Sequence, residues 1–97
     1  MESPNSGMRA ELRLDSVEED ARYLIDIQSA EHGWQGVAQV AKADGKVEVE
    51  FSPEQTAPMP EWVTDWLRSL LRGAWRDQQS SGWPRRITRW RDKVERR

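Results

Sequence analysis

The chain has 97 residues, with 15 basic and 17 acidic side chains, one His, no Cys and a formal net charge of −2. This length allows one small domain. The composition excludes disulfides, thiol catalysis, iron–sulfur clusters, cysteine-based zinc sites and every metal site that needs two imidazoles.

The two ends of the chain set the expected domain organisation. We expect residues 1–8 to be a disordered leader, residues 9–82 a single α+β domain, and residues 83–97 a basic C-terminal segment. The first eight residues have neither the basic start nor the apolar run of a signal peptide. No apolar run approaches the ~20 residues that a membrane helix needs. We therefore expect a soluble, cytoplasmic protein that does not bind membranes.

The first predicted element is a short strand over residues 9–14. Ala10, Leu12 and Leu14 alternate with polar residues, so they would share one face of the strand. If this strand lies at the edge of its sheet, it can pair with a second copy of the chain and form a homodimer.

The stretch after this strand fits two structures. Ser16 and Glu19 have the spacing of a capping box, which is typical of a helix start. Tyr23 and Ile25 belong to an alternating, β-branched pattern that favours a strand over residues 21–28. We favour a turn followed by this strand, and the helix stays the alternative.

A β-hairpin is predicted over residues 37–51. Its two arms flank Asp44-Gly45, a pair that is typical of a tight two-residue turn. With that loop, apolar residues would pair on one side of the hairpin and polar residues on the other. The predicted pairs are Val40 with Val49, Ala38 with Phe51, Gln39 with Glu50, and Ala41 with Glu48.

A long amphipathic helix is predicted over residues 60–79. Pro60 suits the first helical position and Gly82 suits the end of the helix. The helix would pack a wide, Trp-rich face on an antiparallel β-meander of three to four strands. The residues of that face are Trp62, Val63, Trp66, Leu67, Leu70, Leu71 and Ala74.

The C-terminal segment is predicted to form a short basic helix or an arm. Ile87, Trp90 and Val94 are spaced three and four residues apart, which gives a narrow apolar stripe. The residues between them are basic or polar.

The charge is unevenly distributed along the chain. Residues 68–97 hold ten basic and three acidic side chains, a net charge of +7, whereas residues 1–67 carry −9. Such asymmetry indicates a contact with a charged partner. The alternative is that the two parts attract each other within the fold, or that each is a solvated surface.

Few residues offer chemistry. His32 suits an exposed loop better than a general base, because no nucleophile accompanies it. The acidic run Glu18-Glu19-Asp20 lacks the glycine-containing loop of a calcium site and suits a solvated turn. No phosphate-binding loop, nucleotide fingerprint or nucleophile elbow is present. We therefore expect no enzyme activity, no cofactor and no metal.

The tryptophans have two interpretations. We expect Trp62, Trp66 and Trp34 to pack in the core. The other three, Trp75, Trp83 and Trp90, either cover the rim of the core with arginines stacked on them, or are exposed anchors for a partner.

We predict a non-enzymatic interaction or regulatory module that binds a protein partner through a charge-polarised surface. Its acidic part would face a basic, nucleic-acid-binding protein. The predicted partner-binding residues are Glu18, Glu19, Asp20, Glu48, Glu50, Trp83 and Trp90. The alternative is nucleic-acid binding through the basic C-terminal segment. The residues of that alternative are Arg85, Arg86, Arg89, Lys93 and Arg96.

Overall fold

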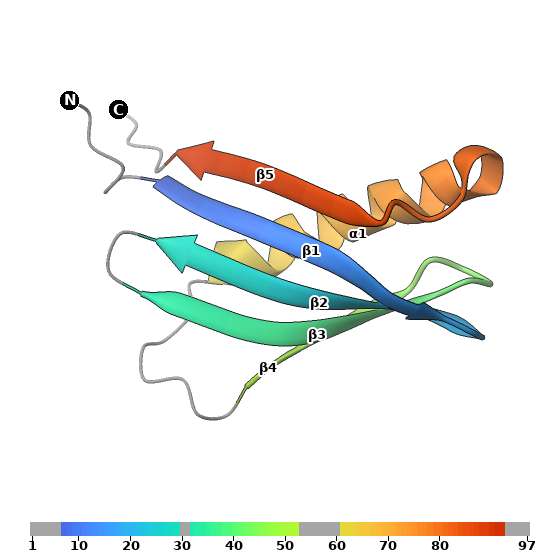
Figure 1. The fold of residues 1–97 in the computed structure, drawn as a ribbon, viewed down its shortest axis with the longest axis horizontal. Helices are drawn as coiled ribbons and strands as arrows, with labels where there is room; N and C mark the ends of the chain where they lie inside the picture. The colour runs from blue at the N-terminus through green and yellow to red at the C-terminus, as the bar shows by residue number, and fades with distance from the viewer. Residues whose placement is uncertain (1–6, 30–31, 53–60, 93–97) are drawn as a thin grey trace.

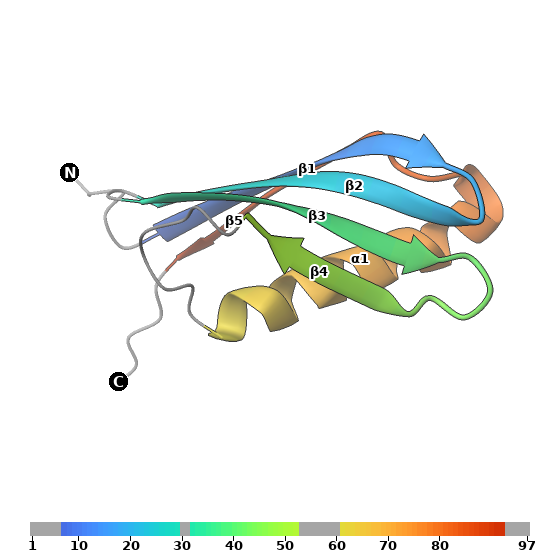
Figure 2. The ribbon, with the colours of Figure 1, turned by 90° about the horizontal axis from the view of Figure 1, so that it is seen from below.

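The computed structural model describes residues 7–29, 32–52 and 61–92. Its elements are β1 (Gly7–Val17), β2 (Asp20–Ser29), β3 (Gly33–Ala41), β4 (Val47–Phe51), α1 (Glu61–Ser81) and β5 (Arg86–Asp92). The strands form one antiparallel sheet in the order β4-β3-β2-β1-β5. The helix lies across one face of this sheet (Figures 1 and 2). The predicted α+β class and antiparallel sheet are confirmed, but the predicted three to four strands are too few, because the C-terminal segment adds a fifth.

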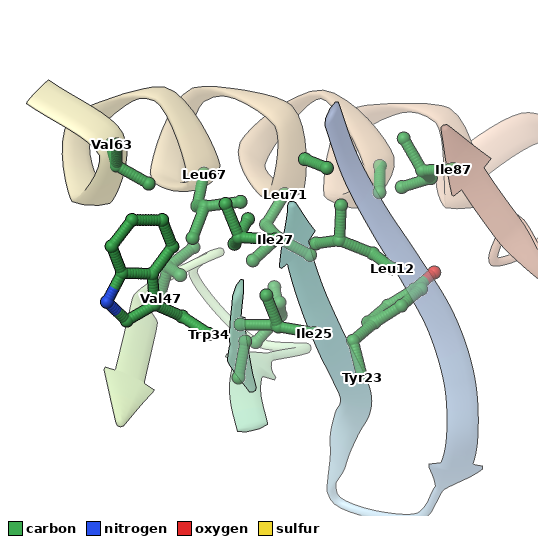
Figure 3. Packing of buried hydrophobic residues seen from close by; sticks show 14 of the residues in the cluster. Leu12, Tyr23, Ile25, Ile27, Trp34, Val47, Val63, Leu67, Leu71 and Ile87 are labelled. Atoms are coloured by element: carbon green, nitrogen blue, oxygen red, sulfur yellow. The ribbon is translucent and has the colours of Figure 1, made fainter. Parts of the chain in front are cut away.

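The core lies between α1 and the sheet face that meets it, which we call the inner face (Figure 3). Alternating residues of the strands are buried there, among them Leu12, Ile27 and Val40. The helix adds a stripe of aliphatic residues, represented by Leu67 and Leu71, one turn apart. Each such side chain contributes about 1.5–3 kcal/mol when it leaves water, so this single layer of contacts stabilises the fold.

β1 is longer and more central than the sequence indicates. It includes Gly7 and Met8, two residues of the predicted leader, and residues 1–6 lie outside the described part. Met8 is buried against the core. Because β1 pairs with β2 on one side and β5 on the other, it has no free edge. The predicted dimer contact through residues 9–14 is therefore wrong.

The ambiguous stretch after β1 is a strand, which confirms the favoured interpretation. The chain turns at Glu18 and Glu19, and β2 begins at Asp20. A bulge between Leu14 and Ser16 shifts the register, so β1 continues past the point where the sequence predicts its end.

The hairpin of β3 and β4 is confirmed, but its predicted register is wrong by two residues. Val40 pairs with Val47, and Ala38 pairs with Val49. The Ala41 N–H donates to the Lys46 carbonyl, which leaves residues 42–45 as a four-residue loop. Because side chains alternate with a period of two, this shift keeps every residue on its predicted face.

The register shift has a cause in the helix. The Trp75 indole N–H donates to the Lys42 carbonyl over 2.9 Å, so the ring lies against the hairpin loop. Gly45 has a φ of 75°, and a Cβ there would lie 2.6 Å from the Trp75 ring. The loop is therefore fitted to a side chain of a distant element, which the dipeptide Asp44-Gly45 alone does not reveal.

The buried face of α1 is narrower than predicted. Its fully buried residues are the small and aliphatic ones, Val63, Leu67, Leu71 and Ala74. Trp66 is half-buried, whereas Trp62, a predicted core residue, is 38% exposed. The tryptophan near the helix start therefore flanks the core.

The C-terminal segment is a strand, which corrects the predicted helix. β5 pairs with β1, and only Ile87 of its apolar residues is buried, opposite Leu12. Trp90 is 69% exposed, so the helical stripe that suggested burial of this ring does not exist. Val94 lies outside the described residues. β5 pairs with the backbone edge that β1 would otherwise expose, and it becomes the edge strand itself.

Tyr23 fixes the approach to β5. Its side chain is fully buried, and its hydroxyl donates to the Pro84 carbonyl over 2.6 Å. The Trp83 ring lies next to it, with the ring centroids 6.4 Å apart. Burial raises the pKa of Tyr23 from 10.0 to about 12.

In the part of the chain that the structure describes, no helix is long and apolar enough to cross a membrane.

The raised pKa of Tyr23 predicts loss of stability at alkaline pH. The unfolded chain releases the phenol proton at about pH 10, but the folded chain keeps it until about pH 12. Stability from this group is therefore complete below pH 10 and falls as pH rises toward 12. Because Tyr23 is the only Tyr, the ultraviolet absorbance of tyrosinate reports its titration directly. Tyr23→Phe is the control: its unfolding free energy should lack this component, and an absorbance midpoint near pH 10 in the native protein would contradict the account.

Two glycines should respond in opposite ways to alanine. Gly45→Ala should lower the free energy of unfolding by about 1–2 kcal/mol from its left-handed φ alone, before the overlap with Trp75. Gly73→Ala should raise it by about 0.5–1 kcal/mol, because this helical glycine has open space around it. Urea denaturation measures both. Equal effects of the two substitutions would contradict the left-handed backbone conformation of Gly45.

Candidate functional site

The sheet face that points away from α1, the outer face, is not covered by any described element (Figure 2). Register places one row of side chains across all five strands of it. That row contains Glu50, Val37, Leu24, Arg13 and Arg86, in the order β4 to β5. A carboxylate therefore stands at one edge, two aliphatic residues stand in the middle, and two guanidinium groups stand at the other edge.

The outer face is hollowed on either side of its middle. A depression of about 540 Å³ lies at the β4 side and is lined by Glu48, Glu50, Val37 and Arg22, and also by Arg68 of the helix. A second depression, of about 450 Å³, lies toward β5. It is lined by Glu11, Arg13, Leu24, Ile25, Asp26, Gln35, Gly36 and Arg86. Both are open hollows of a twisted sheet.

The predicted acidic residues gather at one end of the sheet. Glu18 and Glu19 form the β1–β2 turn, which lies at the same end as the β3–β4 loop (Figure 1). Asp20 and Glu48 line one shallow depression of about 90 Å³, together with Lys46. All of these side chains are exposed, and so is Glu50. The structure thus brings together acidic residues that lie far apart in the sequence.

The carboxylates differ in whether a cation neutralises them. Glu11 contacts Arg86 over 2.9 Å and Arg9 over 3.4 Å. By contrast, no ion pair within the described ranges 7–29, 32–52 and 61–92 includes Glu48 or Glu50. Surface pairs contribute at most about 1 kcal/mol each, but they remove charge from the surface that a partner meets. Glu48 and Glu50 are therefore two neighbouring carboxylates of the outer face that have no ion pair among the described residues, although Arg22 and Arg68 line the same depression.

The predicted basic residues do not share one surface. Because β5 is a strand, Arg86 lies on the outer face, whereas Arg89 lies on the inner side, opposite Ala10. The Arg89 guanidinium donates to the Thr88 carbonyl over 2.9 Å. Arg85 is exposed just before the strand. Lys93 and Arg96 lie outside the described residues.

The two tryptophans of the predicted binding set have different surroundings. Trp83 is half-buried against Tyr23 and the core, which agrees with the rim interpretation. Trp90 stands exposed on the outer face of β5, opposite Arg9. On the other side of that strand, the Arg91 guanidinium lies 5.1 Å from the centre of the Trp62 ring. The end of β5 is therefore aromatic and basic on both sides.

His32 is exposed beside Trp34, and its backbone N–H donates to the Ser29 hydroxyl. Among the described residues, no group of three or more His, Asp or Glu side chains could hold a metal ion.

Sequence reasoning missed four arginines of the outer face and its rim. Arg9 and Arg13 join the basic side only because β1 pairs with β5. Arg22 and Arg68 reach the acidic side, where they line the same depression as Glu48 and Glu50. No local signal marks these residues, because each proximity depends on strand order or on where the helix crosses.

The fold and its uncovered face define a two-layer α+β domain with one polar, charge-graded sheet surface. No protein-family model matches the chain, and neither a curated protein nor a solved structure matches it.

Proposed function

We propose that this protein is a non-enzymatic interaction module that binds a basic protein partner through the acidic side of its outer face. The observation that carries the proposal is the pair Glu48 and Glu50. Both carboxylates are exposed on the outer side of β4, and no described cation pairs with them. Exposed, uncompensated charge of one sign attracts a partner of the other sign and raises the association rate.

The surroundings of the two glutamates support a protein surface as the target. Val37 lies between them and the middle of the sheet, half-buried in the same depression. A patch with a small apolar centre and charged margins is typical of protein interfaces. Asp20 extends the acidic margin toward the β1–β2 turn, where Glu18 and Glu19 add charge.

Removing the β4 charges should abolish partner capture. We expect immobilised wild-type protein to retain basic proteins from a native lysate at about 0.1 M salt, where charges act over about 10 Å. The double variant Glu48→Gln, Glu50→Gln should lose them. The matched control is Asp65→Asn with Asp77→Asn, which removes the same charge from exposed positions of α1. Recovery of the same proteins by both double variants would contradict the proposal.

A second function, nucleic-acid binding, is favoured by one observation, the exposure of Trp90. This ring is 69% exposed and has Arg9 opposite it on the outer face, whereas Arg91 lies on the other side of the strand. Aromatic rings flanked by arginines stack on unpaired bases. One observation argues against nucleic-acid binding: Glu11 forms ion pairs with Arg9 and Arg86, which neutralises part of the positive charge near Trp90.

Titration with single-stranded DNA at several salt concentrations tests this second function. Binding through β5 should weaken as salt rises, with log K falling by roughly 0.7 per phosphate contact for each tenfold change in salt. Trp90→Ala should weaken it further, by about 1–3 kcal/mol for each stacked base that is lost. Absence of binding at low salt would eliminate this function.

A further inference from the structure

β4 is an edge strand, and half of its backbone groups have no partner among the residues that the structure describes. The Ala41 N–H donates to the Lys46 carbonyl, and the Ser52 N–H donates to the Gln35 carbonyl, each over 2.9 Å. In an antiparallel ladder, the residues that bond to the neighbour alternate with residues that face away. Glu48 therefore directs its backbone N–H and C=O toward β3, as does Glu50.

The same phase turns the backbone of the three apolar β4 residues outward. Val47, Val49 and Phe51 direct their N–H and C=O groups away from β3, toward the open edge. No hydrogen bond from another described residue to these outward groups is present. Their side chains point to the inner face. A partner strand at this edge would therefore contact the backbone N–H and C=O groups rather than the apolar side chains.

On the opposite edge strand, β5, one outward backbone carbonyl is already occupied. The Leu14 N–H donates to the Arg85 carbonyl, which sets the phase of β5 and turns the backbone of Thr88 outward. The Arg89 guanidinium already occupies the Thr88 carbonyl over 2.9 Å. Charged side chains that occupy an edge are a usual protection against strand pairing. β4 carries no comparable cap among the described residues.

The charges beside the β4 edge oppose self-pairing. Two copies of β4 in antiparallel contact would pair Val47, Val49 and Phe51 among themselves. Consider each antiparallel register in which at least two of these three residues pair with one another across the contact. In every such register, Glu48 or Glu50 lies opposite a glutamate of the second copy. Like charges directly opposite each other are destabilising in a sheet. A strand with cations at those positions meets the opposite charge instead.

We propose that β4 binds an extended segment of a partner protein by antiparallel strand addition. The segment carries Lys or Arg at alternate positions, opposite Glu48 and Glu50, and β-branched residues between them. The latter point to the inner side of the sheet, as Val49 does, and both Val49 and Arg68 of the helix line the depression at the β4 edge. Backbone bonds to the edge supply affinity, and the alternating side chains supply specificity. This inference rests on the proposed function, because it names how the acidic surface holds its partner.

A synthetic peptide tests the proposal directly. The probe is acetyl-Lys-Val-Lys-Val-Lys-Val-Lys-amide, titrated into the full chain at about 0.01–0.05 M salt, where charge attraction is weakly screened. The control peptide has the same composition with its lysines and valines in blocks. Calorimetry measures affinity, and amide chemical shifts locate the site. The alternating peptide should shift the amides of β4 and bind at least about tenfold more tightly, the effect of one hydrogen bond or more.

Methylation of the peptide backbone tests strand pairing while the protein stays unaltered. N-methylation of the central Val removes a donor that faces β4 and should weaken binding at least about tenfold. N-methylation of the following Lys removes a donor that faces solvent and should leave affinity within about twofold, since no bond to the protein is lost.

Proline substitutions at the edge strands remove a single backbone N–H from the protein, as methylation does from the peptide. Val49→Pro removes only an outward N–H, which edge strands tolerate, and should weaken peptide binding at least about tenfold. Val49→Ala keeps the N–H and controls for the lost side chain. Thr88→Pro makes the same change on the β5 edge and should leave affinity unchanged.

The outcomes separate the two proposals. If Glu48→Gln with Glu50→Gln loses the peptide but neither methylation nor Val49→Pro matters, strand addition is overturned and the acidic surface stands. If the peptide does not bind at low salt, strand addition is also overturned, and lysate capture tests the proposed function independently. If Val49→Pro fails to fold, the two methylated peptides still distinguish strand addition from charge attraction alone.

Discussion

One helix covers one face of the sheet, and the remaining features depend on this one-sided burial. The aliphatic stripe represented by Leu67 and Leu71 meets the alternate residues of the strands, and this contact is the hydrophobic core. Because strands alternate, the same pattern that fills the inner face places polar side chains on the outer face. A sheet that is buried on one face has a solvent-exposed second face, and in this protein the exposed face carries the charged side chains.

Strand order then decides which charges meet. The sequence separates into an acidic part and a basic part, but the sheet pairs β1 with β5 and thereby brings Glu11 to Arg86. The basic edge is partly neutralised by this contact. Glu48 and Glu50 lie on the opposite edge strand, away from β5, and have no ion pair among the described residues. The asymmetry that matters for binding is therefore between two edges rather than between two parts of the chain.

Sequence patterns predict those elements whose structure depends mainly on neighbouring residues in the chain. Alternation predicts β1 and β2, and the proline start and apolar stripe predict α1. The signals fail where a distant residue takes part. The Trp75 indole contacts the hairpin loop, which has four residues instead of two, and the register of β4 differs accordingly. β5 escapes prediction because only Ile87 of its apolar residues is buried, so seven residues of strand offer no period to detect. Of the candidate site, the acidic β4 residues are predicted from the sequence, whereas the arginines beside them depend on tertiary contacts.

Amide hydrogen exchange of the free protein tests most directly whether β4 presents an open edge. The amides of Glu48 and Glu50 bond to β3, while that of Val49 faces outward, so Val49 should exchange at least about tenfold faster than its two neighbours. That alternation within three consecutive residues would establish the open edge on which the binding account depends. If Val49 is protected as strongly as Glu48 and Glu50, another group already occupies the edge, and the account is wrong.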